Sequence, residues 1–259
     1  MRRLASHAIA AAAVSLCLAG PALAAGDAPE VKSQSWSFSA PFGLFDRGQL
    51  QRGYKVYKEV CASCHAMRLL HFRNLGEPGG PEFSEGAVKA LAASVEVADG
   101  PNDQGEMFNR PGRPSDKFPS PFKNDAEARA ANNGALPPDL SVIAKARPHG
   151  PDYLYALLTG YKDAPADVKL ADGMNYNAAF PGHQIAMPNP LNPDQVEYTD
   201  GTAQTVDNYA RDVSAFLMWA AEPKLEERHR VGLRFMIYLL VLAAFLFIAK
   251  RWLWAQVAH

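Results

Sequence analysis

The feature that most constrains this chain is the run Cys61-Ala62-Ser63-Cys64-His65. It is the pattern at which c-type haem is attached. Two thiols separated by two residues can reach the two vinyl groups of one porphyrin edge, and His65, held next to them, is placed to bind the iron. A chain with this motif must fold around a large cofactor. One motif predicts one covalent haem c.

The amino-terminal segment predicts export from the cytoplasm. Arg2 and Arg3 precede an apolar, Ala-rich run over residues 8–20, and small residues follow up to Ala25. This order of charge, apolar run and small residues is typical of a secretory signal peptide. We therefore expect a signal peptide at 1–24.

The carboxy-terminal segment predicts a membrane anchor. Residues 231–249 form a run of nineteen residues that is interrupted only by the charge of Arg234. About 20 apolar residues are needed to cross the hydrocarbon core of a bilayer. We expect a periplasmic domain over 25–223, and a transmembrane anchor with a short cytoplasmic tail over 224–259.

The charges that flank this segment and the signal peptide predict opposite orientations of the span in the membrane. More cations precede the span than follow it, which by the positive-inside rule places the preceding side in the cytoplasm. The export signal is the stronger argument, because a translocated domain is largely indifferent to flanking charge. We expect a single pass through the bacterial inner membrane, with the domain in the periplasm and the carboxy terminus in the cytoplasm. The cations concerned are Lys224, Arg228, Arg230 and Arg234 before the span, against Lys250 and Arg251 after it.

Two other uses of a Cys-x-x-Cys pair are less compatible with the sequence. A structural zinc site needs four N or S ligands, and the only other cysteine, Cys17, lies in the predicted signal peptide. A thioredoxin-like dithiol is expected near a βαβ pattern, which is absent from the pattern of the sequence. The adjacent His65 and the export signal favour haem c.

A haem that transfers electrons needs a second axial ligand, and a thioether opposite histidine raises its reduction potential. Met187 follows Pro181 and precedes Pro188 and Pro190. These prolines predict a stiff extended loop that could hold a thioether on iron. From position alone Met187 is the preferred ligand. The alternatives left open are Met107, Met174 and His183.

The hydrophobic pattern predicts a mainly α domain. Leu50, Gly53, Tyr54 and Tyr57 form a helical stripe within residues 46–60, just before the motif. Further helices are expected over 151–158 and 206–220. Proline and glycine residues interrupt the remaining segments of the domain, and no segment has a convincing strand pattern. We expect a class I-like cytochrome c domain with short helices and long ordered loops around the haem, plus one carboxy-terminal transmembrane helix.

The charge of the domain excludes one class of partner and suggests another. Residues 25–223 contain 18 Lys and Arg against 25 Asp and Glu, a net charge of −7. No basic footprint for nucleic acid exists, and a partner steered by charge should be basic. The densest acidic segment, residues 77–106, is the candidate docking surface. Its acids are Glu77, Glu82, Glu85, Glu96, Asp99, Asp103 and Glu106.

Several segments closely resemble the cytochrome c1 family, the haem c subunits of the cytochrome bc1 complex. The resemblance covers nearly everything from about Trp36 to the membrane segment, and the run from Ala130 to Ser141, which contains Asn132-Asn133-Gly134, is more specific than the haem motif. The matching segments are 52–57, 99–102, 105–108, 110–112, 130–141, 157–161 and 219–223.

The resemblance implies a role for individual residues and for partners. Cys61 and Cys64 would carry the thioether bonds, His65 and Met187 would bind the iron, and Arg129 would contact a haem propionate. The implied function is a non-catalytic electron relay inside a quinol–cytochrome c reductase. The implied partners are cytochrome b, a Rieske iron–sulfur protein, a soluble c-type cytochrome and membrane lipid, within a dimeric complex.

Two other functions are compatible with the motif alone. A membrane-anchored cytochrome c that feeds a terminal oxidase would show the same haem motif and anchor. A haem-based gas sensor or peroxidase would need an open sixth position on the iron. The chain also departs from some family members, which have an extra disulfide, because no cysteine is left to form one. The loop between Gly160 and Met187 must therefore be held in another way.

Overall fold

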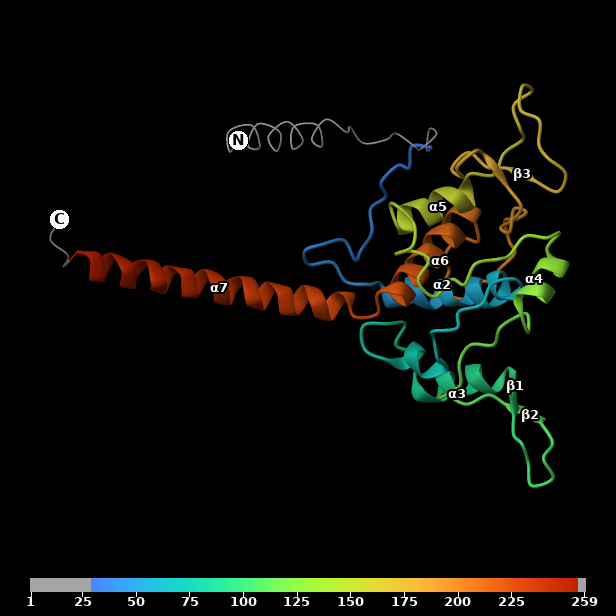
Figure 1. Ribbon diagram of the computed structural model, residues 1–259, viewed down its shortest axis with the longest axis horizontal. Coiled ribbons are helices and arrows are strands. Elements are labelled where there is room, and N and C mark those ends of the chain that lie inside the picture. The colour runs from blue at the N-terminus through green and yellow to red at the C-terminus, as the bar shows by residue number, and fades with distance from the viewer. Residues whose placement is uncertain (1–28, 256–259) are drawn as a thin grey trace, which may run out of the picture.

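Two helices that are far apart in the sequence pack together at the centre of the fold (Figure 1). In the computed structural model, which describes residues 29–255, these are α2 (Arg47–Glu59) and α6 (Val206–Ala221). Each begins with a capping side chain, Asp46 for α2 and Thr205 for α6, which accepts a hydrogen bond from a free amide of the first turn. Both helices agree with the predicted ranges.

The contact between α2 and α6 depends on a glycine and on a buried ion pair. A β-carbon at Gly53 would lie 2.1 Å from the carbonyl oxygen of Asp212, so only glycine allows the backbones to approach this closely. The Asp212 side chain is buried, and its Oδ2 accepts a hydrogen bond of 2.7 Å from Nε of Arg52. The two helices are therefore fixed in register as well as packed.

Short elements and long loops surround this pair. The helix predicted over 151–158 is α5 (Pro151–Thr159), which packs on α6. It begins with a proline at its first position and ends at Gly160. The remaining short helices of the domain are η1 (Cys61–Ser63), η2 (Phe72–Gly76), α3 (Glu85–Ala93) and α4 (Asp125–Ala131).

The expectation of no strands was wrong in detail. The structure contains two small antiparallel sheets, β1 (Glu96–Asp99) with β2 (Phe108–Pro111), and β3 (Asn175–Tyr176) with β4 (Gln184–Ile185). Strands β1 and β2 expose polar and charged residues and have no continuous apolar face. Hydrophobic alternation, the usual signal for a strand, is therefore missing from their sequences.

The loop between Gly160 and Met187 is held by a buried asparagine. Asn177 is fully buried; its amide nitrogen donates to the Leu157 carbonyl at 2.8 Å. Its Oδ1 accepts from the backbone amides of Ala179 and Phe180, at 3.0 and 3.2 Å. These bonds, together with the β3–β4 pairing, hold the loop without a disulfide among the described residues.

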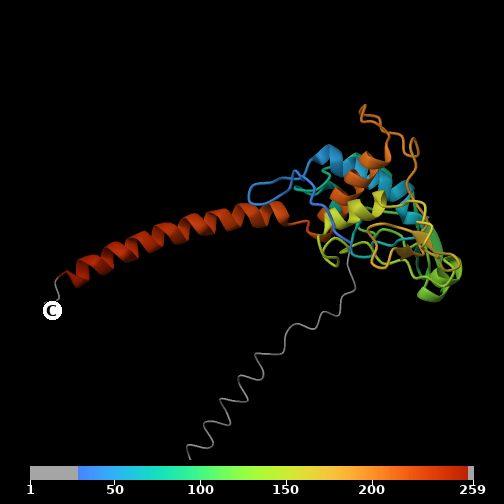
Figure 2. The same cartoon turned by 90° about the horizontal axis from the view of Figure 1, so that it is seen from above.

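The chain ends in a single long helix, α7 (Leu225–Trp254), which extends away from the domain in both views (Figures 1 and 2). It is long and apolar enough to cross a membrane, and its apolar side chains are exposed. The predicted span of 231–249 lies inside it. The predicted signal peptide at 1–24 and the last four residues lie outside the described residues.

Candidate haem site

Helix α2 delivers the two cysteines at its carboxy-terminal end. The backbone turns after Glu59 into the short helix η1, and the amides of Cys64 and His65 both donate to the Cys61 carbonyl, at 3.1 and 2.9 Å. Both thiols are free and partly buried. Within the described residues no group of three or more His, Cys, Asp or Glu side chains could hold a metal ion, so the pair has no zinc-site partners.

His65 is oriented by a residue far along the chain. Its Nδ1 lies 2.8 Å from the carbonyl oxygen of Pro138. A carbonyl can only accept, so Nδ1 carries the proton and Nε2 is left with its lone pair. Burial lowers the pKa of His65 below its usual value. The imidazole is therefore neutral, the form that binds a metal.

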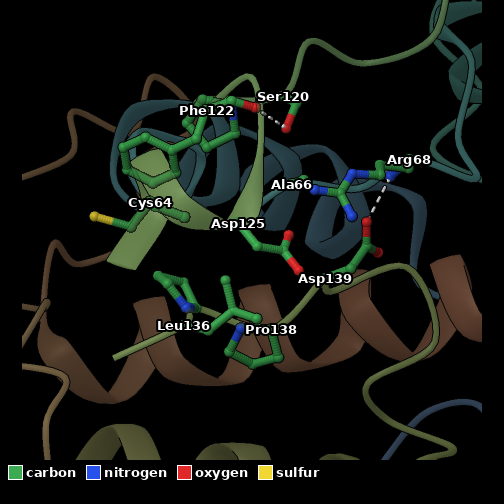
Figure 3. A pocket seen from close by; sticks show the side chains of 12 residues that line it. Cys64, Ala66, Arg68, Ser120, Phe122, Asp125, Leu136, Pro138 and Asp139 are labelled. Atoms are coloured by element: carbon green, nitrogen blue, oxygen red, sulfur yellow. Dashed lines mark hydrogen bonds between the residues drawn. The ribbon is translucent and has the colours of Figure 1, made fainter. Parts of the chain in front are cut away.

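The segment that contains Pro138 is attached to the residues after the motif by several further bonds. The Leu140 amide donates to the Ala66 carbonyl at 2.8 Å. The carboxylate of Asp139 accepts from the Arg68 amide at 3.0 Å, one of the dashed lines in Figure 3. These bonds fix the Pro138 carbonyl relative to the imidazole.

Two cavities flank the motif and share the wall formed by Ser120 and Pro121. The first has a volume of about 140 Å³ and contains the Cys64 side chain at its edge, with Phe122 and Leu136 on its walls (Figure 3). The second, of about 210 Å³, is mostly apolar. It is lined by Tyr54, Tyr57, Lys58, Ala62, Phe72, Val95, Phe118, Pro119, Ser120 and Pro121.

These residues fit a covalent porphyrin. Cys64 lines the first cavity and Cys61 lies three residues before it, partly buried. His65, next to Cys64, presents a free Nε2, and aromatic side chains line the second cavity. Burial and the neighbouring Cys64 raise the pKa of the Cys61 thiol to about 12. The Cys61 thiol is therefore protonated at neutral pH.

Met187 lies in the loop just after β4, and its backbone is anchored from two sides. The hydroxyl of Tyr161 donates to the Met187 carbonyl at 3.0 Å, and Nδ2 of Asn175 lies 3.4 Å from the same oxygen. The side chain is partly buried.

The other candidate ligands have different surroundings. Met107 is 65% exposed beside β2. Met174 lies just before β3, and the ring of His183 stacks on that of Tyr176 at 5.6 Å between centroids. Arg129, the candidate for a propionate contact, is exposed on α4 and its Nη1 donates to the Gly134 carbonyl at 3.0 Å.

The acidic segment is partly neutralised by three cations, of which Lys89 lies inside the segment and Arg47 and Arg110 lie outside it. Glu82 pairs with Arg47 at 2.9 Å, Glu85 with Lys89 at 2.7 Å, and Asp99 with Arg110. Glu77 accepts a hydrogen bond from Asn74. The exposed acids left without an ion pair among the described residues are Glu77, Glu96, Asp103 and Glu106.

Residues that orient the site were missed by the sequence analysis. Pro138 and Tyr161 entered only as parts of the matching segments 130–141 and 157–161, yet each contacts a predicted ligand residue. Asn177 was not singled out. The Pro137-Pro138 pair was the available signal, because two consecutive prolines predict a stiff segment whose carbonyls are fixed in direction.

Comparisons with known proteins agree on one family. The model of the cytochrome C1 family matches residues 36–257. The chain is 45% identical over 275 residues to cytochrome c1 of Rhodospirillum rubrum, covering 100% of both chains. It is 47% identical over 277 residues to cytochrome b/c1 of Bradyrhizobium diazoefficiens, covering 96% of this chain and 40% of that protein. It is also 50% identical over 208 residues to a mitochondrial cytochrome c1 haem protein of Arabidopsis thaliana, covering 80% of this chain and 66% of the relative.

Proposed function

Because the chain belongs to the cytochrome c1 family, the haem-bearing electron-transfer subunits of the cytochrome bc1 complex, we propose that its haem c takes electrons from a Rieske iron–sulfur protein. It passes them one at a time to a soluble c-type cytochrome. The observation that carries this proposal is the family match over residues 36–257, with the haem motif inside it. The subunit itself makes and breaks no substrate bond.

In this proposal each site residue has a separate task. Cys61 and Cys64 would form the thioether bonds to the haem, and Nε2 of His65 and the sulfur of Met187 would be the ligands of its iron. Arg129 would contact a propionate. The haem supplies a one-electron couple whose potential depends on its axial ligands, its burial and nearby hydrogen bonds.

The polypeptide's contribution is to keep this ligand set unchanged while the oxidation state changes. Pro138 fixes the direction of the His65 ring through the bond of 2.8 Å. Tyr161 holds the Met187 backbone through its hydrogen bond of 3.0 Å to the carbonyl. A rigid ligand set lowers the structural change that accompanies electron transfer, and a filled sixth position excludes gases and peroxide.

We also propose the surroundings of the subunit. It binds cytochrome b and works within a dimeric complex, with α7 crossing the bacterial inner membrane. The domain lies in the periplasm and the carboxy terminus in the cytoplasm. Protease added to sealed spheroplasts should digest the domain from outside; digestion only from the cytoplasmic face would contradict this orientation.

The acceptor is proposed to dock on the unpaired part of the acidic segment. Glu96, Asp103 and Glu106 belong to or lie next to the β1–β2 hairpin, are exposed, and have no cation beside them among the described residues. A cluster of this kind raises the association rate with a basic partner at low salt. Glu82, Glu85 and Asp99 contribute less, because their charges are compensated.

A carbon monoxide test separates this function from a gas sensor or peroxidase. The reduced protein should give the same spectrum with and without carbon monoxide, since both axial positions are filled. A large spectral shift would show an open position and contradict the proposal. Co-purification with a dihaem cytochrome b and a Rieske protein, rather than with a terminal oxidase, would distinguish the second alternative.

A further inference from the structure

The loop before α2 exposes two large apolar side chains. Phe42 is 68% exposed and Leu44 58% exposed, although the aromatic residues on both sides of them, Phe38 and Phe45, are buried. The two exposed residues are not part of the domain core. They form a small apolar knob, Phe42 and Leu44, on the exposed part of the loop.

This knob stands on a rigid base. The Gly43 amide donates to the Ser39 carbonyl at 2.9 Å, and the Leu44 amide donates to the Ser37 carbonyl at 3.0 Å. Below it, the rings of Phe38 and Phe45 lie 4.7 Å apart. A β-carbon at Gly43 would lie 2.2 Å from the Ser39 carbonyl oxygen. Because the loop is closed this tightly, it must present Phe42 and Leu44 outward.

The loop is bonded to the first turns of α7. The Phe45 amide donates to Oε1 of Glu226 at 2.8 Å, and Nδ1 of His229 lies 3.4 Å from the Gly43 carbonyl. Arg47 binds the same Glu226 carboxylate with two nitrogens, at 2.6 and 2.9 Å. Both cartoon views place the loop beside the start of α7 (Figures 1 and 2).

These contacts fix the level of the knob along the helix. The apolar run of α7 begins at Val231, two residues after His229, and a helix rises by about 1.5 Å per residue. The contact is made by the His229 ring, and side chains lean toward the start of a helix, so Gly43 lies about one helical turn, ~5 Å, before the apolar run. The headgroup layer on each side of a bilayer is about 5–7 Å thick. With α7 across a bilayer, Phe42 and Leu44, which flank Gly43, would lie within the headgroup layer.

We propose that Phe42 and Leu44 insert into the phospholipid interface as a second membrane contact beside α7. Apolar side chains at this depth gain by leaving water. The inference rests on the proposed membrane anchoring. Charge supports lipid as the occupant, because Arg230 and Arg234, on the same helix turns, have no ion pair among the described residues and can bind phosphate groups.

A second membrane contact would fix the orientation of the domain, which a single helix does not. One helix with a flexible joint leaves the domain free to tilt, whereas a helix and a knob joined through Glu226 define an orientation. The periplasmic domain, and with it the haem, would then be held at a fixed angle to the membrane surface.

Spin labelling of the haem-loaded chain, with the predicted signal peptide and its Cys17 removed, in vesicles of phosphatidylcholine and phosphatidylglycerol tests the proposal. The haem thioethers consume Cys61 and Cys64, so a nitroxide can be attached at one introduced cysteine, F42C or L44C. Collision with oxygen, which concentrates in lipid, is compared with collision with a water-soluble nickel chelate. M107C is the matched exposed control on the hairpin, and L240C reports on the α7 span.

The expected result is an oxygen-to-nickel accessibility ratio several-fold higher at positions 42 and 44 than at 107. Water-like values at 42 and 44, with a lipid-like value at 240, would overturn the second contact and leave the anchor intact. A water-like value at 240 would overturn the anchor itself, and the proposal with it. Labels at 42 and 44 that lose nickel access only in the assembled complex would identify a protein partner and overturn lipid as the occupant.

Discussion

The ring nitrogen Nδ1 of His65 lies 2.8 Å from the backbone oxygen of Pro138, a residue 73 positions further along the chain. This bond sets the tautomer of the imidazole and directs Nε2 away from the loop. A hydrogen bond from the far nitrogen of a metal-binding histidine fixes the ring and makes it a better ligand. Pro138 is therefore a positioning residue, although its side chain carries no polar atom.

The first prediction concerns this bond. P138G should loosen the loop by about 1 kcal/mol, which corresponds to roughly fivefold faster solvent exchange of the His65 Nδ1 proton. Exchange can be followed by NMR in the reduced, diamagnetic protein. P148G, in an exposed loop that does not contact His65, is the control and should leave exchange unchanged. Equal exchange in P138G and wild type would show that the bond does not need the proline.

The second prediction concerns Met187. M187H should keep a six-coordinate haem but lower its midpoint potential by on the order of 0.1 V or more, within the ~0.8 V range that axial ligands span. M187A should open the sixth position and allow carbon monoxide to bind. M107L, an exposed methionine beside β2, should change neither property. If M187A still resisted carbon monoxide, another residue would be the ligand.

The sequence predicts the strongly patterned parts of this fold well. Helix α2 was expected from the stripe Leu50, Gly53, Tyr54 and Tyr57, and all four residues are buried. α5 and α6 were expected from proline punctuation and apolar spacing. These elements were predictable because their signals are local and repeat with the helical period.

Other features depend on contacts between distant segments and could not be predicted in this way. The β1–β2 hairpin has no apolar alternation and is supported by Arg110, which binds both Asp99 and Asp116. The bond between His65 and Pro138 joins two loops, so no periodicity reports it. The neutralisation of Glu82 likewise depends on Arg47, which lies in another element.

The third prediction concerns the loop that carries Met187. N177A removes a buried amide that bonds to Leu157, Ala179 and Phe180. An unsatisfied buried polar group costs about 1–3 kcal/mol, so N177A should lower the free energy of unfolding by about 2–4 kcal/mol. Urea titration measures this, and carbon monoxide binding should increase before global unfolding. N175A, whose side chain makes only long contacts of 3.4 and 3.5 Å, should cost less. Equal losses would argue against a special role for Asn177.

The fourth prediction is a pH dependence. Hydrogen bonds from Arg110 and from the Arg113 amide lower the pKa of Asp116 from 3.8 to about 2. A lowered carboxyl pKa means that the charged form is favoured in the folded state. Its contribution to stability is complete above pH 3.8 and is lost as the pH falls through about 2. The stability difference between wild type and D116N should be constant near neutral pH and shrink over that interval. A stability difference that stayed constant as the pH fell to about 2 would show that the charge of Asp116 contributes nothing to stability.

The fifth prediction concerns the docking surface. Three acids near the β1–β2 hairpin, Glu96, Asp103 and Glu106, are exposed and unpaired among the described residues. E96Q/D103N/E106Q should slow association with a basic soluble cytochrome several-fold at low salt, because the steering field weakens when its nearest charges are removed. The Debye length shortens from about 10 Å at 0.1 M to about 3 Å at 1 M salt, so wild type and variant should converge at high salt. Stopped-flow oxidation of the reduced complex measures the rate.

A variant with the same change of net charge decides whether position matters. D163N/D167N/D172N removes three exposed acids from the loop between α5 and β3, on a different part of the domain (Figure 1). If docking occurs at the hairpin, this variant should retain most of the wild-type rate, since its charges are farther from the partner. Equal slowing by both variants would mean that the overall negative field steers the acceptor. In that case the hairpin acids would be a solvated surface, and the site of electron exit would have to lie elsewhere around the haem.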